Sequence, residues 1–155
     1  MADRRIRIAK DKVQLVKELS VQEGGKGFFR HMVDILAFSA ALGYARNNRS
    51  PLNEPAKVPD PIRHSVFQTH GYDTVINLLA VADSEDPGIL ANRDDMEDKR
   101  AAIFEEYANG GLEIIDRELK GAIDYLDTTL LLIAGERSRN EEETESGIDL
   151  TKLME

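Results

Sequence analysis

The spacing of apolar positions changes along the chain and predicts a short strand followed by several helices. Residues 5–10 alternate polar and apolar side chains, which is typical of a short exposed strand. Asp11 can then cap a helix that runs to Leu19, because the apolar residues between them fall at helical spacing. Residues 28–45 are apolar on nearly every side, which predicts a central helix buried by its neighbours or by a second subunit.

The middle of the chain is predicted to be irregular, with short helical pieces. Residues 46–61 contain four of the five prolines and are expected to form an extended loop. Short helices are expected at about 62–69 and 73–82. A turn-rich link follows at 83–95, and the apolar pair at 89–90 is expected to dock within it.

One long helical region is predicted from about residue 95 to residue 134. Its heptad positions step by three and four, and they are Leu112, Ile115, Leu119, Ala122, Leu126, Thr129 and Ile133. A dimer seam and an ordinary intramolecular bundle helix explain this seam equally well. The two glycines of Asn109-Gly110-Gly111 are costly inside a helix, so either the chain breaks there or another backbone approaches closely.

These elements together predict a mainly α fold. We expect a compact helical domain with a long C-terminal helix and at most a short N-terminal ribbon strand. Residues 1–135 are assigned to this single domain. Residues 136–155 are assigned to an acidic, largely flexible C-terminal tail, because Glu141-Glu142-Glu143-Thr144-Glu145 is a run of solvated charge.

Composition narrows the classes of protein. The 155 residues are enough to bury a core, and the absence of cysteine excludes disulfides and thiolate chemistry. The charged start has no apolar run behind it and no stretch is long enough to span a membrane, so we expect a soluble, cytoplasmic protein.

Charge is divided unevenly between the two parts of the chain. Residues 1–50 carry a net charge of +5 and the remainder −14. A cationic face for nucleic acid or an acidic partner is one consequence. Mutual neutralisation of the two parts inside the fold is the other.

Chemistry-bearing residues do not form a recognisable catalytic pattern. His64 and His70 are six residues apart and do not share a helix face, while His31 is expected to be a core residue or a helix-end group. A metal-dependent nuclease or hydrolase around Glu105, Glu106 and nearby aspartates is the enzymatic alternative. We expect no catalytic residue, no metal and no cofactor.

Residues 46–50, Arg46-Asn47-Asn48-Arg49-Ser50, are the best nucleic-acid candidate, because Arg and Asn suit phosphate and base-edge contacts. Lys26 and Arg30 flank a glycine-rich loop that lacks the Walker pattern but could touch phosphate. The full DNA-binding set on this alternative is Arg5, Arg7, Lys26, Arg30, Arg46 and Arg49. A helix end whose arginines pair with the acidic half is the competing explanation.

Two phrases of the sequence carry a family resemblance. They are Phe38-Ser39-Ala40-Ala41-Leu42-Gly43, continued by Arg49-Ser50-Pro51-Leu52, and Phe104-Glu105-Glu106-Tyr107-Ala108-Asn109-Gly110-Gly111-Leu112. They resemble the small accessory proteins of bacterial DNA phosphorothioation (Dnd) systems, in particular the Dnd-system-associated protein 4 family, over roughly residues 10–130.

A more distant resemblance is to DndE, the small DNA-binding component of the modification machinery. It implies a ribbon-helix-helix-like core and oligomers, with Arg5, Arg7 and Lys10 on the ribbon. The acidic second half departs from DndE and disfavours direct contact with DNA.

The resemblance implies a non-enzymatic accessory subunit of a phage-defence system that marks DNA by phosphorothioation or restricts unmarked DNA. Expected partners are other proteins of that system and further copies of the chain, with DNA as the alternative and no membrane. The residues expected to carry assembly are Phe28, Phe29, Met32, Leu36, Leu112, Ile115, Leu119, Leu126 and Ile133.

Overall fold

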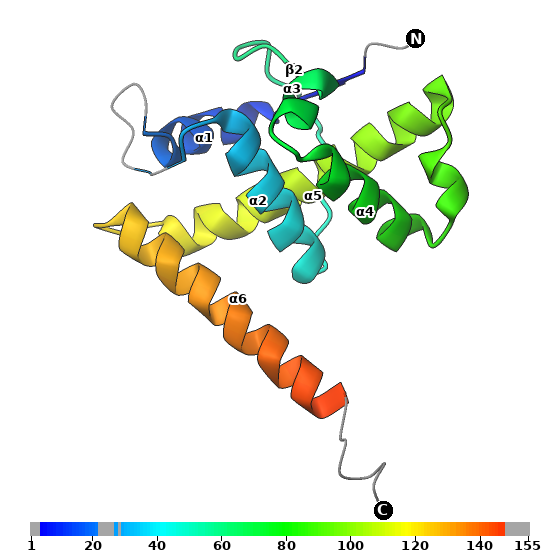
Figure 1. Cartoon of the computed structure of the whole chain (residues 1–155). Helices are drawn as coiled ribbons and strands as arrows, with labels where there is room; N and C mark the ends of the chain where they lie inside the picture. Colours follow the sequence, from blue (N-terminus) through cyan, green and yellow to red (C-terminus); the bar gives the residue numbers. More distant parts are fainter. Residues whose placement is uncertain (1–3, 22–26, 28, 148–155) are drawn as a thin grey trace, which may run out of the picture.

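The computed structural model describes residues 4–21, 27 and 29–147, and their fold is mainly helical, as the sequence predicts (Figure 1). In chain order its elements are β1 (Arg5–Ile6), η1 (Lys10–Lys12), α1 (Val13–Leu19), α2 (Met32–Ala45), β2 (Ile62–Arg63), α3 (His64–Thr69), α4 (Asp73–Ser84), η2 (Pro87–Leu90), α5 (Asp94–Leu119) and α6 (Tyr125–Gly147). Phe28 and Lys26 lie outside the described residues.

The predicted N-terminal strand is confirmed and has a distant partner. β1 pairs antiparallel with β2, with Arg5 opposite Arg63 and Ile6 opposite Ile62. Ile6 is 1% exposed and belongs to the core, so the ribbon has one buried side. Sequence periodicity could not supply the second strand, because two residues are too few to show an alternation.

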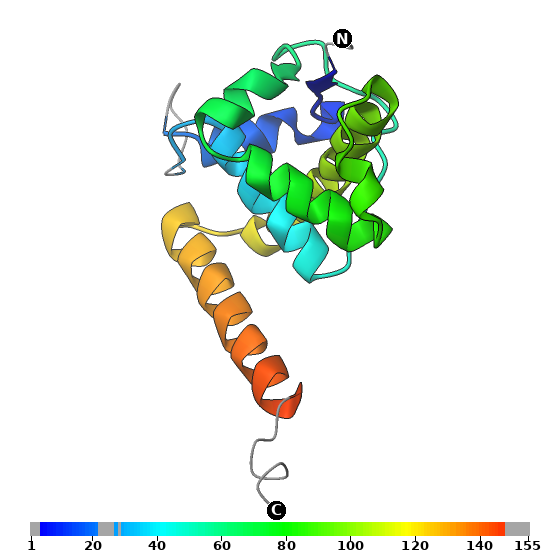
Figure 2. The same cartoon turned by 45° about the vertical axis from the view of Figure 1, so that its right-hand side comes forward.

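Helices α2 and α5 form the centre of the molecule and cross one another (Figures 1 and 2). The sequence of α2 is apolar nearly all round, and Ile35, Leu36 and Ala40 are each at most 1% exposed. The predicted central helix is therefore confirmed from Met32 onwards, and elements of its own chain bury it.

The short helices and the link between them also agree with the sequence pattern. α3 and α4 lie where the spacing predicts them. Within the link, η2 buries Ile89, whereas Leu90 is 45% exposed. Only the first residue of the expected docking pair is therefore part of the core.

The prediction of a single long helical region over residues 95–134 is wrong. α5 ends at Leu119, and the chain turns through Gly121, whose φ of 79° is a left-handed conformation that glycine adopts without strain. Asp124 then accepts a hydrogen bond at its Oδ1 from the Asp127 N–H (3.1 Å) at the start of α6. The heptad positions therefore lie on two helices, and no continuous seam runs from Leu112 to Ile133.

The last described helix continues beyond the predicted end at residue 134. α6 runs to Gly147, so the backbone of residues 136–147 is helical although the sequence assigned it to a flexible tail. Residues 148–155 lie outside the described part of the chain. Figures 1 and 2 both show the second half of α6 extending away from the other helices.

Candidate functional site

The two characteristic phrases of the sequence lie against each other, one on α2 and the loop after it, the other on α5. A Cβ atom at Gly111 would overlap the carbonyl group of Ser39 on α2. A Cβ atom at Gly110 would overlap the carbonyl oxygen of Asn48. Of the two explanations for the paired glycines, close backbone approach is therefore confirmed and a helix break is not.

The loop after α2 is fastened to α5 by hydrogen bonds. The Asn48 Nδ2–H donates to the Gly110 carbonyl (2.8 Å), and the Ser50 N–H donates to the Glu106 carbonyl (3.0 Å). In the other direction, the Asn109 Nδ2–H donates to the Ser50 carbonyl (3.2 Å). The polar groups of residues 46–50 that the sequence offered for contact with nucleic acid therefore form hydrogen bonds to α5 of the same chain.

Arg49, in the same loop after α2, forms ion pairs with carboxylates of α4 and α5. Its Nε–H donates to Glu106 Oε2 (2.6 Å) and its Nη1–H to Asp83 Oδ2 (2.9 Å). The guanidinium also lies over the Tyr107 ring, 5.6 Å from the centroid. The Tyr107 hydroxyl donates to Asp83 Oδ1 (2.6 Å), and burial together with this hydrogen bond raises the pKa of Tyr107 to about 12.

Arg46 pairs with the last helix instead. Its Nε–H donates to Glu136 on α6. The Glu136 side chain is 15% exposed, and its other carboxylate oxygen is buried without a partner in the described structure. Arg46 therefore joins the end of α2 to α6.

Glu105 anchors the N-terminal ribbon to α5. Its side chain is 2% exposed, and its Oε1 accepts from Arg4 Nη2 (2.9 Å) and Arg7 Nη2 (3.0 Å). Its Oε2 accepts from Arg7 Nε (3.0 Å) and from the Arg7 backbone N–H (2.7 Å). A buried carboxylate with this many donors is a structural anchor, because the two arginines compensate for its desolvation.

The remaining basic candidates do not join these arginines in one patch. Arg5 is half-buried on β1, and Arg30 is exposed before the start of α2. Arg46 follows the last residue of α2, so the 14-residue helix separates it from Arg30 by roughly 20 Å. Among the described members of the DNA-binding set, Arg30 and Arg46 therefore lie near opposite ends of α2.

The described residues that were expected to carry assembly differ in their exposure. Leu36, Leu112, Ile115 and Leu119 are at most 3% exposed and belong to the protomer's own core, whereas Leu126 and Ile133 are 42% and 39% exposed. Phe29 and Met32 pack against that core and are half-buried. Among the described residues of the list, Leu126 and Ile133 on α6 are therefore the exposed ones.

Exposed apolar side chains gather on and just before α6. They are Ile123, Leu126, Leu130, Leu131 and Ile133. The helix itself is attached through Thr129 and Leu132, which are 1% and 8% exposed. The sequence spacing identified part of this surface but placed it on one seam with the core residues of α5.

The histidines form a small aromatic group at the start of α2. The His31 and His70 ring centroids are 4.8 Å apart, and His70 stacks on Tyr72 at 6.3 Å. Tyr72 donates to Asp34 Oδ1 (2.7 Å), and this bond, assisted by burial, raises the pKa of Tyr72 to about 12. His31 is the N-cap of α2, which confirms the helix-end alternative.

Among the described residues, no three His, Asp or Glu side chains are placed to hold a metal ion.

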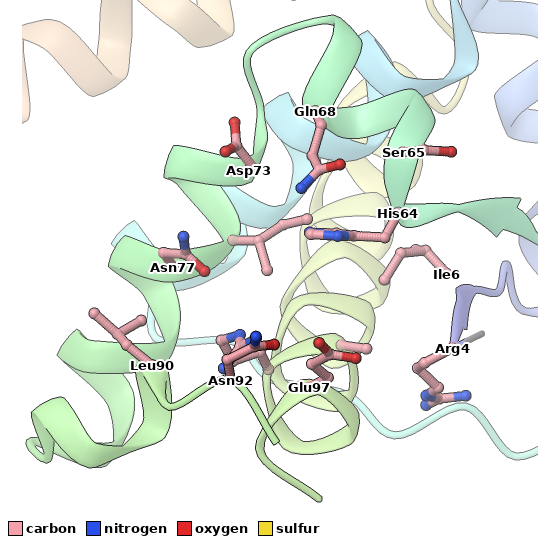
Figure 3. A pocket seen from close by; sticks show the side chains of 13 residues that line it. Arg4, Ile6, His64, Ser65, Gln68, Asp73, Asn77, Leu90, Asn92 and Glu97 are labelled. Carbon is pink, nitrogen blue, oxygen red and sulfur yellow. The ribbon is translucent and has the colours of Figure 1, made fainter. Parts of the chain in front are cut away.

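A polar pocket of about 500 Å³ lies between β1, α3, α4 and α5 (Figure 3). Figure 3 shows His64 and Gln68 extending from α3 into the space between α4 and α5. The charged side chains around it are Arg4, Asp73, Glu97 and Arg100. Both signs of charge are present and Arg4 is already bound to Glu105, so the lining selects no single class of ligand.

The fold defines the class of protein: it is small and mainly helical. Its most specific motifs lie where α2 and the loop after it pack against α5, and α6 presents exposed apolar side chains. The chain belongs to the DNA sulphur modification system-associated protein 4 family, whose model matches residues 5–153. Neither the curated proteins nor the solved structures contain a match to it. In the part of the chain that the structure describes, no helix combines the length and apolar character needed to cross a membrane.

Proposed function

We propose that this protein is a non-enzymatic accessory subunit of a DNA phosphorothioation-linked phage-defence system and that it acts in the cytoplasm by binding other proteins of that system. Membership of the family supports the place in the system. The exposed apolar surface of α6 is the observation that carries the mode of action.

An apolar helix surface of this kind favours a protein partner on energetic grounds. Leu130 and Leu131 are 50% and 73% exposed on a helix that already has a buried side. Fully burying one leucine side chain contributes about 1.5–3 kcal/mol, so covering several of them favours association. Helices that present apolar residues at spacings of three and four commonly bind in a groove or along another helix.

The contacts of the motif residues 105–109 support a non-enzymatic role for the protein, because these side chains bond to groups of the same chain. Glu105 and Glu106, the carboxylates of the enzymatic alternative, are paired with arginines of the same chain. Tyr107 and Asn109 are likewise hydrogen-bonded within the fold. Each of these four side chains therefore has a structural role within the fold.

The DNA-binding alternative has less support from the contacts. Arg7, Arg46 and Arg49 each pair with a carboxylate of the second half of the chain. Contact with phosphate would require these arginines to exchange or share their partners.

The test is capture of the individually purified proteins of the DNA sulphur modification system by the full-length chain. We expect one of them to be retained, and we expect Leu130→Asp to weaken its binding at least about tenfold, which corresponds to about 1.4 kcal/mol. Leu78→Asp on α4 is the matched control, because Leu78 is also exposed (65%) but lies on another helix. Circular dichroism of each variant checks that it is folded.

Two results would contradict the proposal. One is that none of the system's proteins is retained by the wild-type chain. The other is that Leu130→Asp and Leu78→Asp bind equally well, which would place the interface away from α6.

A further inference from the structure

One face of α6 carries a regular apolar stripe that its own protomer covers only in part. Leu126, Leu130 and Ile133 are spaced by four and three residues, and they are 42%, 50% and 39% exposed. Arg137, four residues further on, continues the same line. We call the three apolar residues the α6 stripe.

The α6 stripe is distinct from the side of the helix that packs on the body. That side is formed by Tyr125, Thr129, Leu132 and Glu136, each half-buried or buried. At 3.6 residues per turn, the centre of the stripe lies about 100° around the helix from the centre of the packed side. A partner can therefore cover the stripe without displacing α6.

We propose that the α6 stripe pairs with the same stripe of a second copy of this chain, with the two α6 helices antiparallel. This inference rests on the proposed function: the dimer is the form that binds the other proteins of the system, so Leu130→Asp weakens their capture through loss of the dimer. The argument for a second copy is the order of charge along the helix. Asp127 lies at the beginning of the stripe and Arg137 at its end, so two antiparallel copies bring opposite charges together at both ends.

The register follows from the spacing of the stripe. When Leu130 lies opposite Ile133 of the partner subunit, two-fold symmetry places Ile133 opposite Leu130 of the partner subunit. Leu126 then lies opposite Arg137 of the partner subunit, whose guanidinium can reach Asp127. A parallel pair would instead place like charges next to each other, so the charge order selects the antiparallel arrangement.

Charge reversal tests this pairing directly. Asp127→Arg and Arg137→Asp each place like charges together at both ends of the pair, and the double variant restores opposite charges. Residues 127 and 137 of one helix are about 15 Å apart, so the double variant cannot restore a contact within one chain. Recovery in the double variant therefore reports a contact between two chains.

The measurement is the mass in solution by light scattering over about 1 to 100 μM, because the fraction of chains in a dimer rises with concentration. We expect the wild-type mass to rise from 17.3 kDa to twice that value. Each single reversal, and Leu130→Asp, should raise the concentration at half-association at least about tenfold, which is 1.4 kcal/mol. The double reversal should recover most of that loss, and Leu78→Asp should leave it unchanged.

The outcomes separate this inference from the proposed function. A wild-type mass of 17.3 kDa at all concentrations would overturn the pairing. If capture of a protein of the modification system remained sensitive to Leu130→Asp in that case, the proposed function would stand with that protein on the stripe. A dimer with no recovery in the double reversal would overturn the antiparallel register. A dimer that behaves as expected but captures no protein of the system would overturn the proposed function alone.

Discussion

Gly111 sets the distance between α5 and α2 at the point where the two helices cross. Alanine has the higher helix propensity by about 1 kcal/mol, so propensity alone predicts that Gly111→Ala stabilises the protein. A Cβ at this position would overlap the backbone of Ser39, which cannot move without shifting α2. We expect the overlap to dominate and Gly111→Ala to lower the free energy of unfolding by about 1–3 kcal/mol.

Gly135→Ala is the matched control for this prediction. Gly135 is also inside a helix, but a Cβ there would meet no atom within 4 Å. We expect Gly135→Ala to raise the free energy of unfolding by about 0.5–1 kcal/mol. Urea unfolding measures both variants, and equal effects of the two substitutions would show that the crossing does not need glycine.

Tyr107 makes the stability of the joint depend on pH in the alkaline range. Burial and the hydrogen bond to Asp83 raise its pKa from 10.0 to about 12. Between these values the unfolded chain loses the phenolic proton while the folded protein keeps it, so the folded protein binds more protons. The stability that comes from this shift is complete below pH 10 and is lost as the pH rises towards 12.

Tyr107→Phe isolates that contribution. We expect the free energy of unfolding of the variant to fall less steeply with pH than that of the wild type between pH 10 and 12. Other groups that titrate in this range are present in both proteins and cancel in the comparison. Parallel curves for the two proteins would contradict the assignment.

At the scale of elements, the sequence predicted what local periodicity determines. The apolar residues of α2 predicted a central helix, and two backbones that approach closely were one of the two explanations for Gly110 and Gly111. The heptad prediction was wrong because it treated Gly121 as one more helical position. The sequence does contain the stop signals: Gly121 in the turn after α5 and Asp124 before α6.

The hydrogen-bond and ion-pair partners of the polar motif residues could not be predicted from the spacing of nearby residues. Arg49 and Glu106 are 57 residues apart in sequence, and Arg7 and Glu105 are 98 apart. Spacing along one element cannot identify such pairs, because they depend on how α5 crosses the ribbon and α2. The sequence offered pairing with the acidic half as an alternative, but it could not choose between that and DNA.

At the scale of the whole molecule, arginines of the positive first part of the chain pair with carboxylates of the negative second part, as Arg4 does with Glu105. Arg7 meets Glu105, Arg46 meets Glu136, and Arg49 meets Asp83 and Glu106. The net charge of −9 is therefore not divided into a free cationic face and a free anionic face at these positions. A polyanion approaching them meets a carboxylate beside each guanidinium, which weakens its attraction.

This arrangement predicts the result of a DNA gel shift. We expect no retention of double-stranded DNA at ~50 mM salt, a condition that favours phosphate contacts. If DNA is retained, the retention should weaken as the salt concentration rises. The Arg46→Ala/Arg49→Ala variant should then abolish the retention. The Arg5→Ala/Arg30→Ala variant is the control, because it removes the same number of positive charges elsewhere. Unfolding measurements are needed beside it, because Arg46 and Arg49 also hold α6 and the loop after α2. Retention that is lost only in a folded Arg46→Ala/Arg49→Ala variant would mean that DNA displaces the internal carboxylates, and the DNA-binding alternative would then replace the assembly proposal.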